Sequence, residues 1–210
     1  MEPIPAFTLP LSHLTVAGFL DSATGRGASR NQGDYAAIAT VGLAPSGHFY
    51  FLDLWLRRAA PTAQIAAIFD LHERWRYALF GIETNCFQQL LLLPIEEERK
   101  RRRALWESAA LSCPSIFPAW QLPIREVPHS RPKEVRIASL EPLLANGWLR
   151  LSAALPDLFW AELESFPHGQ HDDSLDALEG ALSLLRAQQD LLVPVTPHAR
   201  RGSLNTLERF

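Results

Sequence analysis

Three aspartates lie close together in the sequence FPHGQHDDSLDAL, which covers residues 166–178. Asp172 and Asp173 are adjacent, and Asp176 follows Asp172 by about one helical turn. Adjacent carboxylates repel each other unless a cation lies beside them, so this stretch predicts a metal-binding site. The alternative is an ordinary helix start, because acidic side chains also stabilise the first turn of a helix. Leucines at helical spacing predict that helix: Leu175, Leu178, Leu182 and Leu185.

Two further acids directly follow apolar segments. Asp21 comes after residues 14–20 (LTVAGFL), and Glu83 comes after residues 77–82 (YALFGI). Both segments are typical of buried strands. If these strands are neighbours in a sheet, the two acids lie side by side, and a helix packed across the sheet can bring Asp173 to the same place. The simpler alternative for each acid is an ordinary turn residue at a strand end.

Crowded carboxylates with no lysine or arginine beside them would be strongly destabilising unless divalent cations neutralise them. Hard oxygen ligands of this kind favour Mg²⁺ or Mn²⁺ over zinc. Two such ions about 3.5–4 Å apart can activate a water molecule and stabilise the leaving oxygen in phosphodiester cleavage. The main competing acid is Asp53, inside a predicted strand, and we expect it at an edge or exposed position.

A sheet and its helices must position these acids. Residues 35–43 and 48–56 predict two more strands, which form an antiparallel meander with the strand at 14–20. Helices and strands then alternate, which is typical of a mixed sheet with helices packed on it. We expect helices from Pro61, over 87–110 with a break or kink at Pro94, over 133–144 and 156–165, and from Asp172, with short strands at 124–127 and 148–151.

Length and composition suit one sizeable globular domain, since the chain has 210 residues, of which 47% are hydrophobic and 20% charged. No apolar run approaches the roughly 20 residues of a membrane span, so we expect no membrane partner. Cys86 and Cys113 make no CxxC motif, so we expect a protein of the reducing cytoplasm. The formal net charge of -3 argues against a generally basic nucleic-acid binder. We expect a lead-in or severed linker at 1–13, the domain at 14–190 and a tail at 191–210.

Three motifs together resemble the nuclease domain of tailed-phage or prophage terminase large subunits, a family with a ribonuclease H-like fold. These motifs are DSATG at 21–25, the IETN run at 82–85 and the HDD-x-x-DA run at 171–177. The resemblance extends over residues 14–185. It implies three antiparallel strands followed by parallel strands, with helices on both faces of the sheet. It also implies an endodeoxyribonuclease that cleaves double-stranded concatemeric viral DNA during genome packaging, in the cytoplasm of the bacterial host.

The resemblance also implies a ligand set and partners. Two Mg²⁺ or Mn²⁺ ions would be held by the acids at the strand ends and the helix start, namely Asp21, Glu83 and one or both of Asp172 and Asp173. From its position before the acid pair, His171 is a candidate direct ligand or a neighbour of the ligands, although a lone histidine usually has neither role. Asp176 is a second candidate neighbour of the ligands. The implied partners are double-stranded DNA, an ATPase domain, a portal and a small terminase subunit. The chain has no GxxxxGK[ST] loop, so we expect no ATP hydrolysis by these residues, whether the chain is an excised domain or a stand-alone nuclease.

Several basic residues are candidate DNA contacts. Arg26 and Arg30 follow Asp21 in a loop that is equally well explained as solvated. Arg131 and Lys133 open a predicted helix, and the resemblance makes Lys133 a candidate phosphate contact. The charged run EEERKRRR at 96–103 is better explained as a helix face with ion pairs at i,i+4 than as a DNA contact.

Two alternatives to the packaging nuclease remain open. The first is a structure-selective, resolvase-like nuclease of the same fold, which would prefer branched DNA to linear duplex. The second is a non-catalytic docking module that binds a portal or small terminase subunit and shows no metal-dependent cleavage.

Overall fold

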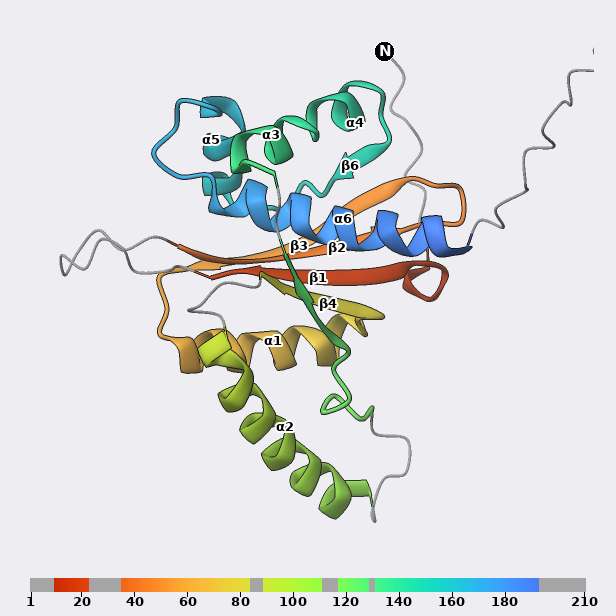
Figure 1. The fold of residues 1–210 in the computed structure, drawn as a ribbon. Helices are drawn as coiled ribbons and strands as arrows, with labels where there is room; N and C mark the ends of the chain where they lie inside the picture. Colours follow the sequence, from red (N-terminus) through yellow and green to blue (C-terminus); the bar gives the residue numbers. More distant parts are fainter. Residues whose placement is uncertain (1–9, 23–34, 84–88, 111–116, 129–130, 193–210) are drawn as a thin grey trace, which may run out of the picture.

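A six-stranded mixed β-sheet lies at the centre of the molecule (Figure 1). The computed structural model describes residues 10–22, 35–83, 89–110, 117–128 and 131–192. In sheet order, the strands are β5 (Ile124–Val127), β4 (Leu79–Glu83), β1 (Thr15–Asp21), β2 (Ala36–Leu43), β3 (Phe49–Arg57) and β6 (Leu149–Leu151). The helices are α1 (Pro61–Trp75), α2 (Gln89–Ala110), α3 (Lys133–Ala138), α4 (Glu141–Ala145), α5 (Asp157–Ser165) and α6 (Asp173–Leu192), preceded by a short 3-10 turn at Leu11–His13.

The predicted antiparallel meander is confirmed, because β2 pairs antiparallel with both β1 and β3. The strands outside it are parallel to their neighbours: β4 to β1, β5 to β4 and β6 to β3. Figure 1 shows α6 across one face of the sheet, with α3, α4 and α5 beyond it, and α1 and α2 on the other face. This is the mixed sheet with helices on both faces that we expected from the sequence.

Side chains of β1 alternate between two apolar cores, one on each face of the sheet. Phe19 packs in the core beneath α6, whereas Leu20 packs in the core against α1. Since successive side chains of a strand point to opposite faces, Asp21 falls on the α6 face, like Phe19. Ile82 belongs to the α1-side core, so Glu83 falls on the α6 face as well. The strand period therefore directs both acids toward α6.

Two glycines allow α6 to lie close to the sheet. A Cβ at Gly180 of α6 would lie 2.5 Å from the Phe19 ring, and a Cβ at Gly81 of β4 would also lie 2.5 Å from it. Phe19 therefore fills the space between a glycine of the helix and a glycine of the neighbouring strand. This close packing sets the distance between the start of α6 and the ends of β1 and β4.

Two helical predictions differ from the structure. Residues 133–144 form two short helices rather than one, because Pro142 lacks an N–H and its ring clashes with the carbonyl four residues earlier. Of the break or kink expected at Pro94, the break does not occur, since α2 runs through this residue. Pro94 lies near the beginning of the helix, so its ring disturbs little more than the first turn.

Among the residues that the structure describes, no helix combines the length and the apolar character needed to cross a membrane. Residues 1–9 and 193–210, which make up most of the expected lead-in and tail, lie outside the described residues.

Candidate active site

Asp21 and Glu83 end two parallel, neighbouring strands. In the register of β1 and β4, Leu20 pairs with Ile82, so the next residues along the two strands are the two acids. Asp176 of α6 completes a compact group, because one carboxylate oxygen from each of the three residues lies within 4.8 Å of the others. The sequence led us to expect Asp173 beside Asp21 and Glu83, whereas the compact group contains Asp176.

Asp172 and Asp173, which the sequence analysis placed among the ligands, lie beside this group at the start of α6. The backbone N–H of Asp176 donates to the carbonyl of Asp172 at 3.0 Å, which closes the first turn of the helix. Asp173 and Asp176 are three residues apart and so project from similar sides of the helix. Of these acids, Asp176 is the one that joins Asp21 and Glu83 in the compact group.

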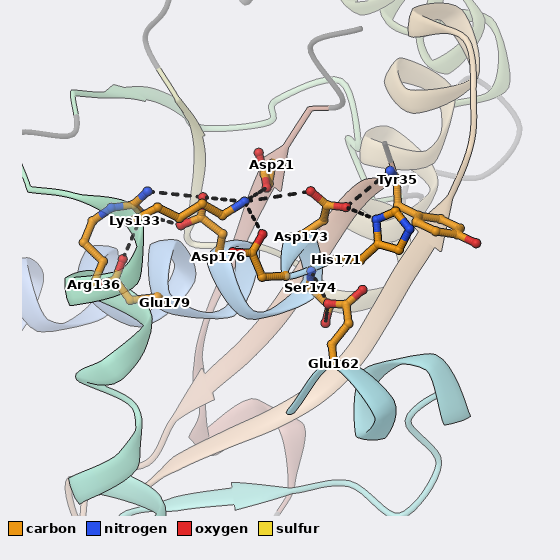
Figure 2. A network of polar contacts seen from close by, with 11 residues as sticks. Asp21, Tyr35, Lys133, Arg136, Glu162, His171, Asp173, Ser174, Asp176 and Glu179 are labelled. Atoms are coloured by element: carbon orange, nitrogen blue, oxygen red, sulfur yellow. Dashed lines mark hydrogen bonds and ion pairs between the residues drawn. The ribbon is translucent and has the colours of Figure 1, made fainter. Parts of the chain in front are cut away.

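Lys133, the first residue of α3, extends its ammonium into the carboxylates (Figure 2). Its Nζ lies 2.8 Å from Asp172, 3.5 Å from Asp176, 3.6 Å from Asp21 and 3.8 Å from Asp173. This corrects one assumption of the sequence analysis, which treated the acids as having no basic residue beside them. Segments distant in sequence come together here, because α3 packs against α6.

Burial and neighbouring charges together shift the pKa values of Lys133 and Asp21. Burial works against the Lys133 ammonium, but the carboxylates of Asp21, Asp176 and Asp172 outweigh it and raise the pKa of the lysine. Burial is also the largest influence on Asp21 and raises its pKa well above the usual value. Lys133 opposes this shift, whereas the nearby acids Asp176, Asp173 and Glu83 add to it. The site therefore carries more negative charge than its lysine neutralises, a condition that favours binding of a divalent cation.

Arg136 of α3 pairs with Asp176 of α6. This buried guanidinium forms an ion pair with Asp176 through Nη1 and donates to Asp176 Oδ2 from Nη2 at 3.2 Å. It also donates to Glu179 Oε2 at 3.2 Å. The roles of Arg136 and Glu179 were not predicted from the sequence. A signal was present, because Lys133 and Arg136 are three residues apart on α3, as Asp176 and Glu179 are on α6.

Glu162 of α5 caps the start of α6, a role that the sequence analysis also missed. Its buried carboxylate accepts a hydrogen bond from the Ser174 backbone N–H at 3.0 Å and another from the Ser174 hydroxyl. Burial raises the pKa of Glu162, and the two hydrogen bonds from Ser174 oppose that shift. The first turn of α6 is therefore anchored to a neighbouring helix.

Asp173 is anchored on its other side by the start of β2. The backbone N–H of Tyr35 donates to Asp173 Oδ2 at 3.3 Å. His171 Nδ1 lies 3.9 Å from the same oxygen, and the His171 ring meets the Tyr35 ring edge-on at a centroid distance of 5.2 Å. The Arg58 guanidinium lies over the Tyr35 ring at 4.6 Å. His171 thus lies beside Asp173 and the ring of Tyr35.

The remaining candidates lie away from the acid group or outside the described residues. Arg26 and Arg30 fall in the part of the chain that the structure does not describe, and Arg131 is exposed. Asp53 is partly buried and accepts a hydrogen bond at 2.8 Å from Nε1 of Trp75 in α1, so it belongs to the opposite face of the sheet.

The charged run at 96–103 forms ion pairs within α2, as expected for a helix face. Arg101 and Arg102 both lie 2.7 Å from Glu98, three and four residues away. Arg102 also bridges to Asp70 of α1 at 2.7 Å. These side chains already have partners within the protein.

By sequence, the chain matches no protein-family model and no curated protein. By structure, it is similar to solved terminase nucleases. The large terminase nuclease from the thermophilic phage G20c with bound zinc has 18% sequence identity and a TM-score of 0.51, over 82% of each chain. The same nuclease with bound magnesium has the same identity and TM-score, over 81% of each chain. The human cytomegalovirus terminase nuclease domain has 12% identity and a TM-score of 0.51, over 81% of this chain and 82% of that one.

The fold expected from the sequence motifs and the fold of these neighbours agree. This chain has the expected mixed sheet, with a central antiparallel meander and helices on its two faces. The chain therefore has the ribonuclease H-like fold of the terminase large-subunit nucleases.

Proposed function

We propose that this chain is a metal-dependent endodeoxyribonuclease that cleaves double-stranded, concatemeric viral DNA during genome packaging. The observation that carries the proposal is the convergence of Asp21, Glu83 and Asp176 from two strand ends and one helix, on the fold of terminase nucleases. The partners that this function requires are duplex DNA, an ATPase domain, a portal and a small terminase subunit. Such a chain would act in the cytoplasm of the bacterial host.

The donor set fits a hard divalent cation such as Mg²⁺ or Mn²⁺. The compact group offers only carboxylate oxygens, which are the ligands that such ions prefer. Asp21, Glu83 and Asp176 would hold one ion. Asp172 and Asp173, which we named as ligands from the sequence, both contact the Lys133 ammonium. Bound divalent ions would supply an activated water and charge stabilisation for the leaving oxygen.

The side chains of the protein would orient this chemistry. Arg136 and Glu162 keep the acids of α6 in place through Asp176 and Ser174, so the ligands need little rearrangement when a cation binds. Arg26, Arg30 and Arg131, with Lys133, remain the candidate contacts to the DNA phosphates.

Cleavage of supercoiled plasmid DNA tests the proposal. We expect nicking and linearisation with Mn²⁺ or Mg²⁺, none with EDTA, and none for the variants Asp21→Asn and Glu83→Gln. Glu107→Gln removes an exposed carboxylate of α2 and serves as the matched control, with unchanged cleavage expected. Full activity of either site variant would refute the assignment, and a preference for a four-way junction over duplex would favour a resolvase-like role.

A further inference from the structure

We propose that Lys133 supplies one of the cations of this active site, so that the chain binds a single divalent ion while the ammonium occupies the second position. The inference rests on the proposed metal site. Lys133 Nζ lies within 4 Å of carboxylate oxygens from four residues: Asp21, Asp172, Asp173 and Asp176. A second divalent ion bound to the same oxygens would have to take the place of this ammonium.

The acids divide into two overlapping sets. Asp21 and Asp176 form the compact group with Glu83, and the same two residues also contact Lys133. Asp172 and Asp173 complete the surroundings of the ammonium. Among the described ion pairs, Lys133 makes none with Glu83. The set that contains Glu83 can therefore receive a divalent ion while Lys133 stays among the other acids.

The position of Lys133 is held by the rest of α3. Arg136, one turn further along the same helix, is buried and paired with both Asp176 and Glu179 of α6. These contacts fix α3 against the helix that carries the acids, so the Lys133 side chain extends from a fixed backbone. The Lys133 side chain as a whole is 32% exposed.

Electrostatics give this arrangement two consequences. In the metal-free protein, the ammonium reduces repulsion among the acids, which would otherwise favour the unfolded chain. Next to a bound divalent ion, it disfavours a second one, because like charges a few ångströms apart repel strongly in a partly buried site. Lys133 should thus lower both the number of bound divalent ions and the affinity for the first.

Isothermal titration of the full chain with Mn²⁺ in the absence of DNA tests the inference. We expect one bound Mn²⁺ per chain for the wild type and two for Lys133→Met, with the first ion bound at least tenfold more tightly by the variant. Lys133→Arg retains the charge and should bind one ion. The matched control is Lys100→Met, which removes the other lysine of the chain, exposed on α2, and should also bind one ion.

Two Mn²⁺ per wild-type chain would overturn the inference without any variant, so the test does not depend on Lys133→Met folding. A single ion in Lys133→Met and in Lys133→Gln would overturn it as well. These outcomes are separate from failure of the proposed function, which is the absence of Mn²⁺-dependent cleavage in the plasmid assay.

Discussion

The carboxylate of Glu162 on α5 accepts a hydrogen bond from the backbone N–H of Ser174, in the first turn of α6, at 3.0 Å. Both side chains are buried. Unpaired N–H groups in the first turn of a helix need acceptors, and a negative charge there also interacts favourably with the helix dipole. A residue outside the acid group therefore determines where α6 begins, and so where Asp173 and Asp176 lie.

Removal of this cap should loosen the site. We expect Glu162→Ala to lower the free energy of unfolding by about 1–2 kcal/mol, because the Ser174 N–H loses its acceptor. Urea unfolding measures the change, and Mn²⁺ titration should show weaker binding. Glu164→Ala removes an exposed acid from the same helix and should change neither quantity. Equal behaviour of the two variants would mean that Glu162 does not position α6.

Replacing Gly180 of α6 by alanine should lower the stability of the protein, the opposite of the usual effect of this change in a helix. Replacing glycine by alanine inside a helix normally stabilises it by up to about 1 kcal/mol. Here the new Cβ would lie 2.5 Å from the Phe19 ring, so we expect Gly180→Ala to destabilise the protein by about 1–3 kcal/mol. Urea unfolding of Gly180→Ala, of Phe19→Leu and of the double variant measures the coupling. The penalty of Gly180→Ala should shrink in the Phe19→Leu background, and strict additivity would contradict the packing argument.

The same packing explains what could be predicted from the sequence. Asp21 and Glu83 could be placed because each directly follows an apolar strand, and parallel neighbours end at the same side of a sheet. The choice among the acids of α6 could not be made, because it depends on how the helix is rotated and how closely Gly180 lies against Phe19. Lys133 was assigned to phosphate rather than to the acids, because its place depends on tertiary contacts between α3 and α6 that no local pattern reports.

His72, on the opposite face of the sheet, should make the protein sensitive to acid. The imidazole is buried and stacks on Tyr77, and burial, with Arg76 and Arg99, lowers the pKa of His72 to about 4. Between pH 6.5 and 4 the unfolded chain binds a proton that the folded protein does not. Stability should therefore fall through this window as the pH drops, by on the order of 3 kcal/mol from this residue.

A neutral replacement tests this contribution. In urea unfolding at several pH values, His72→Leu should lose less stability than the wild type between pH 6.5 and 4. His13→Leu replaces an exposed histidine and should follow the wild type. Parallel pH curves for His72→Leu and the wild type would show that another group causes the acid sensitivity.

The substitution Asp21→Asn should have opposite effects on the melting temperature in the absence and in the presence of metal. Because the folded state raises the pKa of Asp21 above its ordinary value of 3.8, ionisation of this carboxyl costs stability as the pH rises past 3.8. Asp21→Asn has no such cost, so in EDTA at about pH 7 we expect it to melt a few degrees above the wild type. The difference should vanish below pH 3.8, where the wild-type carboxyl is protonated in both states.

In saturating Mn²⁺, the wild type should instead melt at a higher temperature than Asp21→Asn. A bound ion stabilises the folded wild type by mass action, whereas Asp21→Asn lacks one of the proposed ligands and gains little. The same variant should show no plasmid cleavage. An acid that only caps the end of β1 would give no crossover, since its replacement would change stability equally in EDTA and in Mn²⁺. Melting temperatures of the two proteins under the two conditions therefore separate a metal ligand from a structural acid.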